Sequence, residues 1–207
     1  MHSPESFIRA RTALSNIMNN MPYYSNYKAV DIFAREGNWI SDILLSRVDS
    51  LEAWEYNSEF IPALEQNLPT STIRNLDSIN YIQNGTSYAD DRFNVVLIDN
   101  ALNCYGDYCE HFDVLPHIQN IMEENAFIIF NVVRKPFNYT EYPRWQDRRN
   151  KFYGLQDCSH LSSDFVKKFY TDFFDKLGLT VMNYYTECRE YHDDVDYNYM
   201  VGVELHG

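Results

Sequence analysis

The sequence predicts an α/β fold in which helices cover a seven-stranded, mostly parallel sheet that ends in an antiparallel hairpin. Residues 29–39 (AVDIFAREGNW) have the pattern of a buried strand that stops in a short turn and opens a helix. Residues 51–57 (LEAWEYN) give a second strand, which ends in Glu55. Strand and helix patterns go on alternating, which favours parallel strands joined by right-handed crossovers. The last two strand patterns have no helix between them, so we expect them to pair as a hairpin.

The expected elements follow from the spacing of apolar residues. Residues 6–21 have apolar side chains at helical spacing, and Ser3-Pro4 is a suitable start for this leader helix. Residues 93–98 form the continuous apolar run of a strand that is buried on both faces. The predicted strands are residues 28–33, 50–54, 79–82, 93–98, 126–133, 179–186 and 197–205, and helices are expected at residues 6–21, 39–44, 57–68, 107–122 and 162–177.

Length and composition limit what kind of protein this is. With 207 residues, of which 45% are hydrophobic, the chain suits one domain (1–207), with the leader helix in residues 1–24 and a lid-like insertion at residues 134–160. No stretch reaches the roughly 20 apolar residues of a membrane helix, and no signal-peptide pattern is present. Four scattered cysteines indicate reduced thiols and a cytoplasmic protein. A net charge of −13 opposes binding to duplex nucleic acid. The oligomeric state is left open.

The first two strand–turn segments resemble the cofactor-binding half of class I S-adenosylmethionine-dependent methyltransferases. In that family the first strand usually runs into a Glu/Asp-x-Gly-x-Gly-x-Gly turn, and here Phe33, Arg35 and Gly37 stand at the three glycine positions. The resemblance covers residues 25–135 by motif and the remainder by element order. It implies a Rossmann-like, doubly wound sheet, S-adenosyl-L-methionine as cofactor, and O-methylation of a small-molecule or sugar-like acceptor. The alternative is a catalytically silent methyltransferase-like domain that acts as a binding or interaction module.

The resemblance also implies which residues contact the cofactor. Asp31 is expected to fix the turn by accepting backbone N–H bonds, and Glu55 to bind the ribose hydroxyls. Thr86 stands where the family often has an acid for the adenine amino group, and Asp99 is expected on the cofactor amine or a substrate donor. The alternatives are an Arg35 that fills the former cofactor space, a Glu55 that is a solvated charge at a helix start, and an Asp99 that caps a helix. The full set of expected cofactor residues is Asp31, Ala34, Arg35, Gly37, Asn38, Glu55, Tyr56, Thr86, Ser87 and Asp99.

Residues 98–108 (IDNALNCYGDY) carry a second resemblance, to catechol-type O-methyltransferases, which hold a magnesium ion with two aspartates and an asparagine. Asp99 and Asn131 match two of those ligand positions, but Phe130 stands at the third. We therefore expect no bound metal. Asp99 and His111 are candidates for a general base, and Tyr105 is a candidate for a contact that positions the acceptor.

A basic and aromatic segment, residues 134–154, follows the predicted fifth strand. We expect it over the carboxyl edge of the sheet, where doubly wound folds bind ligands. A lid of this composition suits an anionic or sugar-like acceptor, since rings stack and Arg binds carboxylate or phosphate. It also suits a single-stranded nucleic acid. The alternative is a helix at residues 145–152 whose positive face offsets surrounding acids or forms an oligomer contact.

Overall fold

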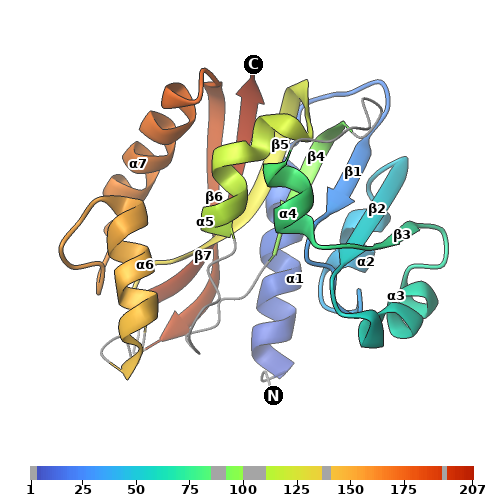
Figure 1. Ribbon diagram of the computed structural model, residues 1–207, viewed down its shortest axis with the longest axis horizontal. Coiled ribbons are helices and arrows are strands. Elements are labelled where there is room, and N and C mark those ends of the chain that lie inside the picture. Colours follow the sequence, from blue (N-terminus) through green and yellow to red (C-terminus); the bar gives the residue numbers. More distant parts are fainter. Residues whose placement is uncertain (1–3, 85–91, 100–110, 137–140, 193–194) are drawn as a thin grey trace.

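The protein is described here by a computed structural model over residues 4–84, 92–99, 111–136, 141–192 and 195–207. In these residues seven strands form one sheet in the order β3-β2-β1-β4-β5-β7-β6 (Figure 1). The strands β1 to β5 are parallel, and β7 lies antiparallel between β5 and β6. The predicted doubly wound α/β fold with a terminal antiparallel hairpin is confirmed. The strands are β1 (Lys28–Asp31), β2 (Ser50–Glu55), β3 (Thr72–Asn75), β4 (Phe93–Ile98), β5 (Met122–Val133), β6 (Thr180–His192) and β7 (Val195–His206).

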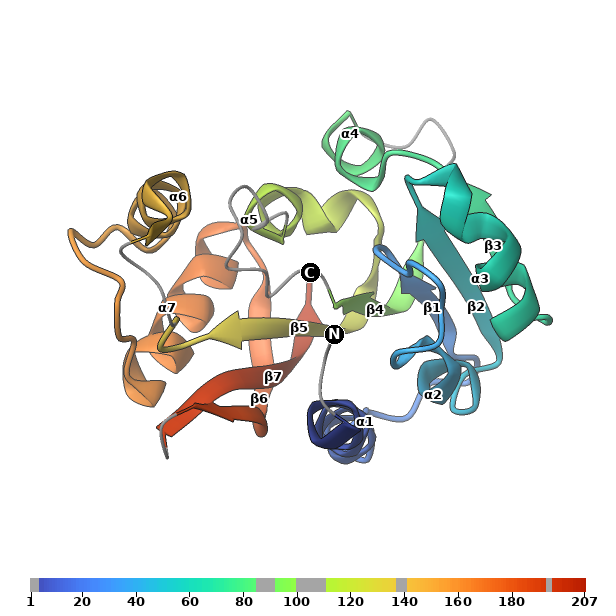
Figure 2. The ribbon, with the colours of Figure 1, turned by 90° about the horizontal axis from the view of Figure 1, so that it is seen from below.

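Helices cover both faces of the sheet (Figure 2). Apolar side chains of α1 (Pro4–Met18), α2 (Ser41–Leu45) and α3 (Ile61–Asn67) belong to the core on one face. The other face is covered by α4 (Ser78–Gln83), α5 (His111–Val114), α6 (Pro143–Tyr153) and α7 (Ser163–Lys176). A 3-10 turn, η1 (Ser58–Phe60), precedes α3, and a second, η2 (Leu115–Asn120), follows α5. No helix in this described part of the chain is long and apolar enough to cross a membrane.

Strand β4 contributes side chains to both halves of the core. Val96 and Ile98 belong to the half under α4–α7, whereas Val95 and Leu97 belong to the half under α1–α3. All four side chains are fully buried. This two-sided burial explains why residues 93–98 show no alternation of polar and apolar side chains.

Helix α1 packs on the face of the C-terminal hairpin, mainly against the edge strand β6 and also against β7. Leu14 and Ile17 are fully buried there. Gly202 of β7 permits the approach, because a Cβ at this position would lie 2.7 Å from Cγ2 of Ile17. At the other end of the helix, the rings of Phe7 and Trp39 lie 5.2 Å apart. The predicted leader helix therefore joins the sheet edge to the turn that follows β1.

Aromatic side chains pack α6 and α7 against α5. The rings of Phe112 and Phe152 stack with their centroids 4.0 Å apart, and Phe152 also contacts Phe169 and Phe173 of α7. Trp145 is buried in the same core. The segment expected to form a lid thus contains a helix whose aromatic face is part of the core. A lid role for it stays a prediction.

The prediction of the third strand was wrong. Residues 79–82 lie in helix α4, and β3 is the earlier segment Thr72–Asn75. Asp77 caps α4, since its side chain accepts a hydrogen bond from the backbone N–H of Asn80 at 3.0 Å. The cap explains why residues 79–82 are helical and not a strand, because it favours a helix that begins at Ser78 and includes these apolar residues. Residues 85–87, which were expected directly after that strand, lie outside the described residues.

Candidate cofactor site

The turn after β1 is fixed from beneath by Asp31, the last residue of that strand. One oxygen of its buried carboxylate accepts a hydrogen bond from Oγ of Ser41 at 2.6 Å, and the other accepts one from the backbone N–H of Phe33 at 3.4 Å. Burial raises the pKa of Asp31 to about 7, and the hydrogen bond from Ser41 opposes this shift. Asp31 thus holds the turn through Ser41 and one backbone N–H, and its role at a cofactor stays a prediction.

Two residues in the turn have positive φ angles, 51° at Arg35 and 72° at Gly37. A Cβ on Gly37 would lie 2.7 Å from Cδ1 of Leu64 in α3, so this glycine is required where the turn packs on the helix. The exposed guanidinium of Arg35 lies over the ring of Phe60, 5.3 Å from its centroid. Asn38 is also exposed, whereas Ala34 is buried.

Glu55 lies at the end of β2 and binds the same turn. Its Oε2 accepts a hydrogen bond from the backbone N–H of Arg35 at 2.8 Å, and its Oε1 accepts one from the backbone N–H of Asn57 at 2.7 Å. The residue is 8% exposed, whereas the neighbouring Tyr56 is 75% exposed. The carboxylate therefore connects the tip of β2 to the turn after β1, which is the carboxyl edge of two adjacent parallel strands.

The end of β3 brings a third segment to this edge. Strand β3 pairs with β2 in parallel, and Asn75 at its end lies beside Glu55. Leu76 and Asp77 come next in the chain, and the backbone N–H of Leu76 donates to the backbone oxygen of Glu55. Sequence reasoning missed these residues because it placed the strand too late. The signal was present in the β-branched pair Thr72-Ile73, followed by Asp77-Ser78 as a helix cap. Thr86 and Ser87, which were predicted in this role, lie outside the described residues.

Asp99 follows β4 and is held by two other side chains. Nη1 and Nη2 of Arg189 donate to its two oxygens, the second at 3.3 Å, and Nδ2 of Asn131 donates to Oδ1. The side chains of Arg189 and Asp99 are only 3% and 8% exposed. Strands β1 and β4 pair in parallel, so Asp31 and Asp99 lie at the same edge, and the charge of Asp99 adds to the rise in the pKa of Asp31. Sequence reasoning missed Arg189, which is 90 residues away in the chain.

His111 lies in a different environment from these acids. Its ring contacts Phe112 and Phe152, and its Nε2 is buried without a hydrogen-bond partner among the described residues. Burial, together with the charges of Arg149 and Arg148, lowers the pKa of His111 to about 3. The imidazole is therefore neutral near pH 7 and is a weak base. Tyr105 lies outside the described residues.

Two arginines of the basic and aromatic segment, residues 134–154, have protein partners. Arg149 is buried, donates from Nη2 to the backbone oxygen of Cys158 at 3.1 Å, and lies over the rings of Trp145 and Tyr153. Arg148 forms an ion pair with Asp113. Arg149 is thus part of the packing of α6. The described residues contain no group of three His, Cys, Asp or Glu side chains that could hold a metal ion, and Phe130 is buried in the core.

Known proteins resemble this chain in structure but not in sequence, since no family model and no curated protein matches it. A SAM-dependent methyltransferase from Leishmania major is similar with a TM-score of 0.61 and 13% identity, over 96% of this chain and 72% of that one. The N-methyltransferase NodS from Bradyrhizobium japonicum has a TM-score of 0.59 and 13% identity over 99% of both chains. Magnesium protoporphyrin IX methyltransferase from Synechocystis, solved with bound SAH, has a TM-score of 0.57 and 11% identity, over 97% of this chain and 84% of that one.

At sequence identities this low, the structural similarity establishes a likeness of fold. The likeness agrees with the strand order, in which the antiparallel β7 is inserted between β5 and β6. It also agrees with the turn after β1 and the acid at the end of β2, which meet at the carboxyl edge. The chain therefore has the class I fold of S-adenosylmethionine-dependent methyltransferases.

Proposed function

We propose that this protein binds S-adenosyl-L-methionine at the carboxyl edge of β1, β2 and β4, and transfers its methyl group to an oxygen of a small-molecule or sugar-like acceptor. The observation that carries the proposal is the position of Glu55. Its carboxylate stands at the tip of β2 and accepts one backbone hydrogen bond at each oxygen. Because a carboxylate oxygen has two lone pairs, each oxygen can still accept one hydroxyl of a ribose.

The described residues fit the other parts of this cofactor. We assign the border of the adenine to Leu76 and Asp77, because they follow β3 next to Glu55. Thr86 and Ser87 stay predicted contacts. Asp31 and Asp99 are two buried acids that suit an amine. When bound, the cofactor supplies a methyl group on a positively charged sulfur. The protein's own part is to orient the acceptor toward that methyl group and to exclude water.

Asp99 and His111 are the two candidates for the base that accepts the hydroxyl proton. Both oxygens of Asp99 accept hydrogen bonds from Arg189, so this carboxylate is better suited to positioning than to proton transfer. His111 is a weak base because its pKa is lowered to about 3. We therefore assign Asp99 a contact with the cofactor or the acceptor, and leave Tyr105 as a positioning candidate. Methyl transfer is expected without magnesium.

Calorimetry with S-adenosylhomocysteine tests the cofactor site. The wild-type protein should bind, and Glu55→Gln should bind more weakly by about 1–3 kcal/mol, since ribose hydroxyls lose a charged acceptor. Glu59→Gln is the matched control, because Glu59 is an exposed acid four residues further along the chain. Thermal unfolding must accompany the titration, since Glu55 also supports the turn. Equal affinities for the wild type and Glu55→Gln would contradict the assignment.

A second candidate function is a catalytically silent binding or interaction module. Arg35 favours this alternative for two reasons. It stands at a glycine position of the family's turn, and its backbone N–H already donates a hydrogen bond to Oε2 of Glu55. This alternative predicts no heat when either S-adenosylmethionine or S-adenosylhomocysteine is titrated into the wild-type protein. Measurable binding of either ligand would exclude a module that has lost its cofactor.

A further inference from the structure

Three carboxyl groups follow one another along the carboxyl edge of the sheet. Strand β1 lies between β2 and β4, so Asp31 at its end stands between Glu55 at the tip of β2 and Asp99 after β4. Asp31 is 1% exposed and Glu55 is 8% exposed. The middle carboxyl group is therefore buried and has an acid on each side.

The partners of these carboxyl groups differ in charge. Asp99 faces the guanidinium of Arg189, and Glu55 accepts two backbone hydrogen bonds. Asp31 accepts hydrogen bonds from Oγ of Ser41 in α2 at 2.6 Å and from one backbone N–H of the turn at 3.4 Å. In the part of the chain that the structure describes, no Lys, Arg or His side chain forms an ion pair with Asp31.

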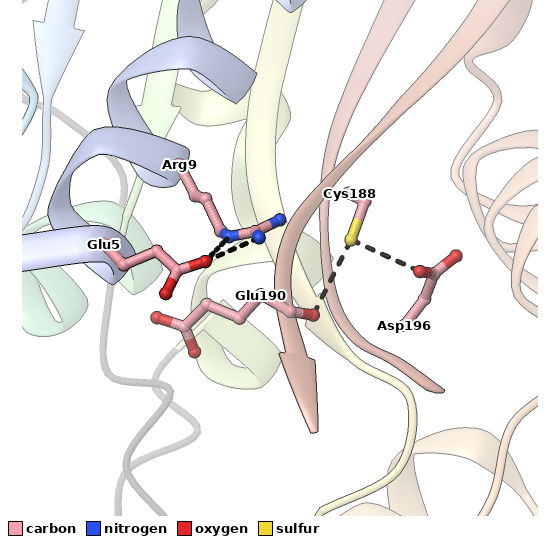
Figure 3. A network of polar contacts seen from close by, with 5 residues as sticks. All are labelled: Glu5, Arg9, Cys188, Glu190 and Asp196. Carbon is pink, nitrogen blue, oxygen red and sulfur yellow. Dashed lines mark hydrogen bonds and ion pairs between the residues drawn. The ribbon is translucent and has the colours of Figure 1, made fainter. Parts of the chain in front are cut away.

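An ionised carboxylate is costly in this position, because burial penalises its charge and the neighbouring acids repel it. Burial raises the pKa of Asp31 to about 7, and the charges of Asp99 and Glu55 add to the rise. The surface acid Glu5 shows the contrast, since Arg9 binds it at 2.7 Å (Figure 3). Asp31 has no such positive charge beside it among the described side chains.

The proposed cofactor would bring a positive charge to this place. With the ribose at Glu55 and the amino acid end toward Asp99, the sulfur that joins these two parts lies over the end of β1. In S-adenosylmethionine this sulfur is positively charged, whereas in S-adenosylhomocysteine it is a neutral thioether. The amino acid end carries the same charges in both molecules, so the charge on sulfur is the electrostatic difference between them.

We propose that Asp31 makes this site distinguish the cofactor from its product, because only the cofactor supplies a positive charge that stabilises the ionised carboxylate. The inference rests on the proposed function. Binding of S-adenosylmethionine favours the ionised form of Asp31, and the displaced proton passes to the solvent. Binding of S-adenosylhomocysteine leaves the protonation of Asp31 nearly unchanged. The preference for the cofactor over the product therefore grows as the pH rises toward neutrality.

Calorimetric titration of both ligands at about pH 5.5 and about pH 7 tests this discrimination. Both values lie below the range of about 7.7–8.0 in which an α-amino group loses its proton. Between them the ionised fraction of Asp31 rises from about 3% to about 50%. The ratio of the two dissociation constants should thus shift in favour of S-adenosylmethionine by about 10-fold. Titrations in two buffers with different enthalpies of ionisation should show proton release with S-adenosylmethionine and little with S-adenosylhomocysteine.

Two variants assign the effect to Asp31. In Asp31→Asn the ratio of dissociation constants should not depend on pH, since no carboxyl group is left to titrate. Ser41→Ala keeps the carboxyl group but removes a hydrogen bond that stabilises its charge, so the shift in the ratio should occur at higher pH. Damage to the turn would weaken both ligands together and leave their ratio unchanged. Glu5→Gln is the matched control, because this acid is exposed and paired with Arg9, and it should behave as the wild type does.

Two results would overturn the inference. One is an equal pH dependence of both affinities in the wild-type protein, which would show that the site does not sense the charge on sulfur through a titrating group. The other is a ratio that changes with pH equally in the wild type and in Asp31→Asn, which would assign the effect to another group. A wild-type protein that binds neither ligand would contradict the proposed function and this inference together, whereas binding with a constant ratio would contradict the inference alone.

Discussion

Arg35 and Gly37 both adopt left-handed backbone in the turn after β1, but for different physical reasons. Arg35 is exposed, and its N–H is bound by Glu55, so the cost of its conformation is offset locally. Gly37 is buried against Leu64 and has no room for a Cβ. The last glycine of the family's turn is thus retained here for packing, while the middle one is replaced where a side chain can point to solvent.

Gly37→Ala should lower the free energy of unfolding by about 2–4 kcal/mol, since it adds a steric overlap to the cost of positive φ. Gly154→Ala is the matched control, because Gly154 also has positive φ, 68°, but a Cβ there would have nothing within 4 Å. Its cost should be about 1 kcal/mol. Urea unfolding of the two variants measures the difference. Equal losses would show that Leu64 yields to the added methyl group.

The raised pKa of Asp31 predicts a pH-dependent stability. Because the folded-state pKa of about 7 lies above the ordinary value of 3.8, the folded state binds more protons between these values. The contribution of this group to stability is therefore full below pH 3.8 and is lost as the pH rises toward 7. Asp31→Asn should gain stability relative to the wild type at pH 8, by up to a few kcal/mol, and little at pH 4.

Urea unfolding at both pH values tests this, with the exposed Asp175→Asn as control. The groups that face Asp31 are Ser41, Asp99 and Glu55. Ser41→Ala removes a hydrogen bond to the carboxylate, so the loss of stability between pH 4 and pH 8 should be larger in this variant. A wild-type stability that rises between pH 4 and pH 7, and rises equally in Asp31→Asn, would contradict a raised pKa at this residue.

At the scale of elements, the sequence predicts the long and strongly patterned segments well. Strands β1, β2 and β4 and helix α7 begin and end within two residues of the expected bounds, because their apolar runs are bounded by caps, turns or charged residues. The segment at residues 78–83 is short and has apolar side chains at positions that suit either a strand or a helix. In such a segment the cap at Asp77 and the burial of Ile82 decide the structure.

The C-terminal hairpin shows what local pattern cannot predict. Strand β6 continues to His192, six residues beyond its expected end, because polar residues such as Glu187 pair with the longer β7. The ion pair between Arg189 and Asp99 depends on this extension, and no local spacing connects residues 90 positions apart. Of the candidate site, the sequence therefore gives the positions of Asp31, Glu55 and Asp99, but not the arginine that faces Asp99.

At the scale of the whole molecule, the excess of acidic over basic residues destabilises the folded state through repulsion. The net charge is −13, and the partly exposed ion pairs, such as Arg11 with Asp42 and Arg74 with Glu52, each contribute about 0–1 kcal/mol. Repulsion among the many remaining acids acts over longer distances than these pairs. The buried pair of Arg189 and Asp99 is shielded from salt, so added salt should act mainly on the repulsion.

We therefore expect sodium chloride to stabilise the protein. Raising its concentration from about 10 mM to about 200 mM shortens the screening length from roughly 30 Å to below 10 Å, which weakens repulsion more than close contacts. The melting temperature should rise by a few degrees, as calorimetry or circular dichroism would show. Potassium chloride should have the same effect, because screening depends on ionic strength and not on the cation. A melting temperature that falls with salt would show that attractive surface pairs outweigh the net charge, and a rise specific to one cation would indicate a bound ion instead of screening.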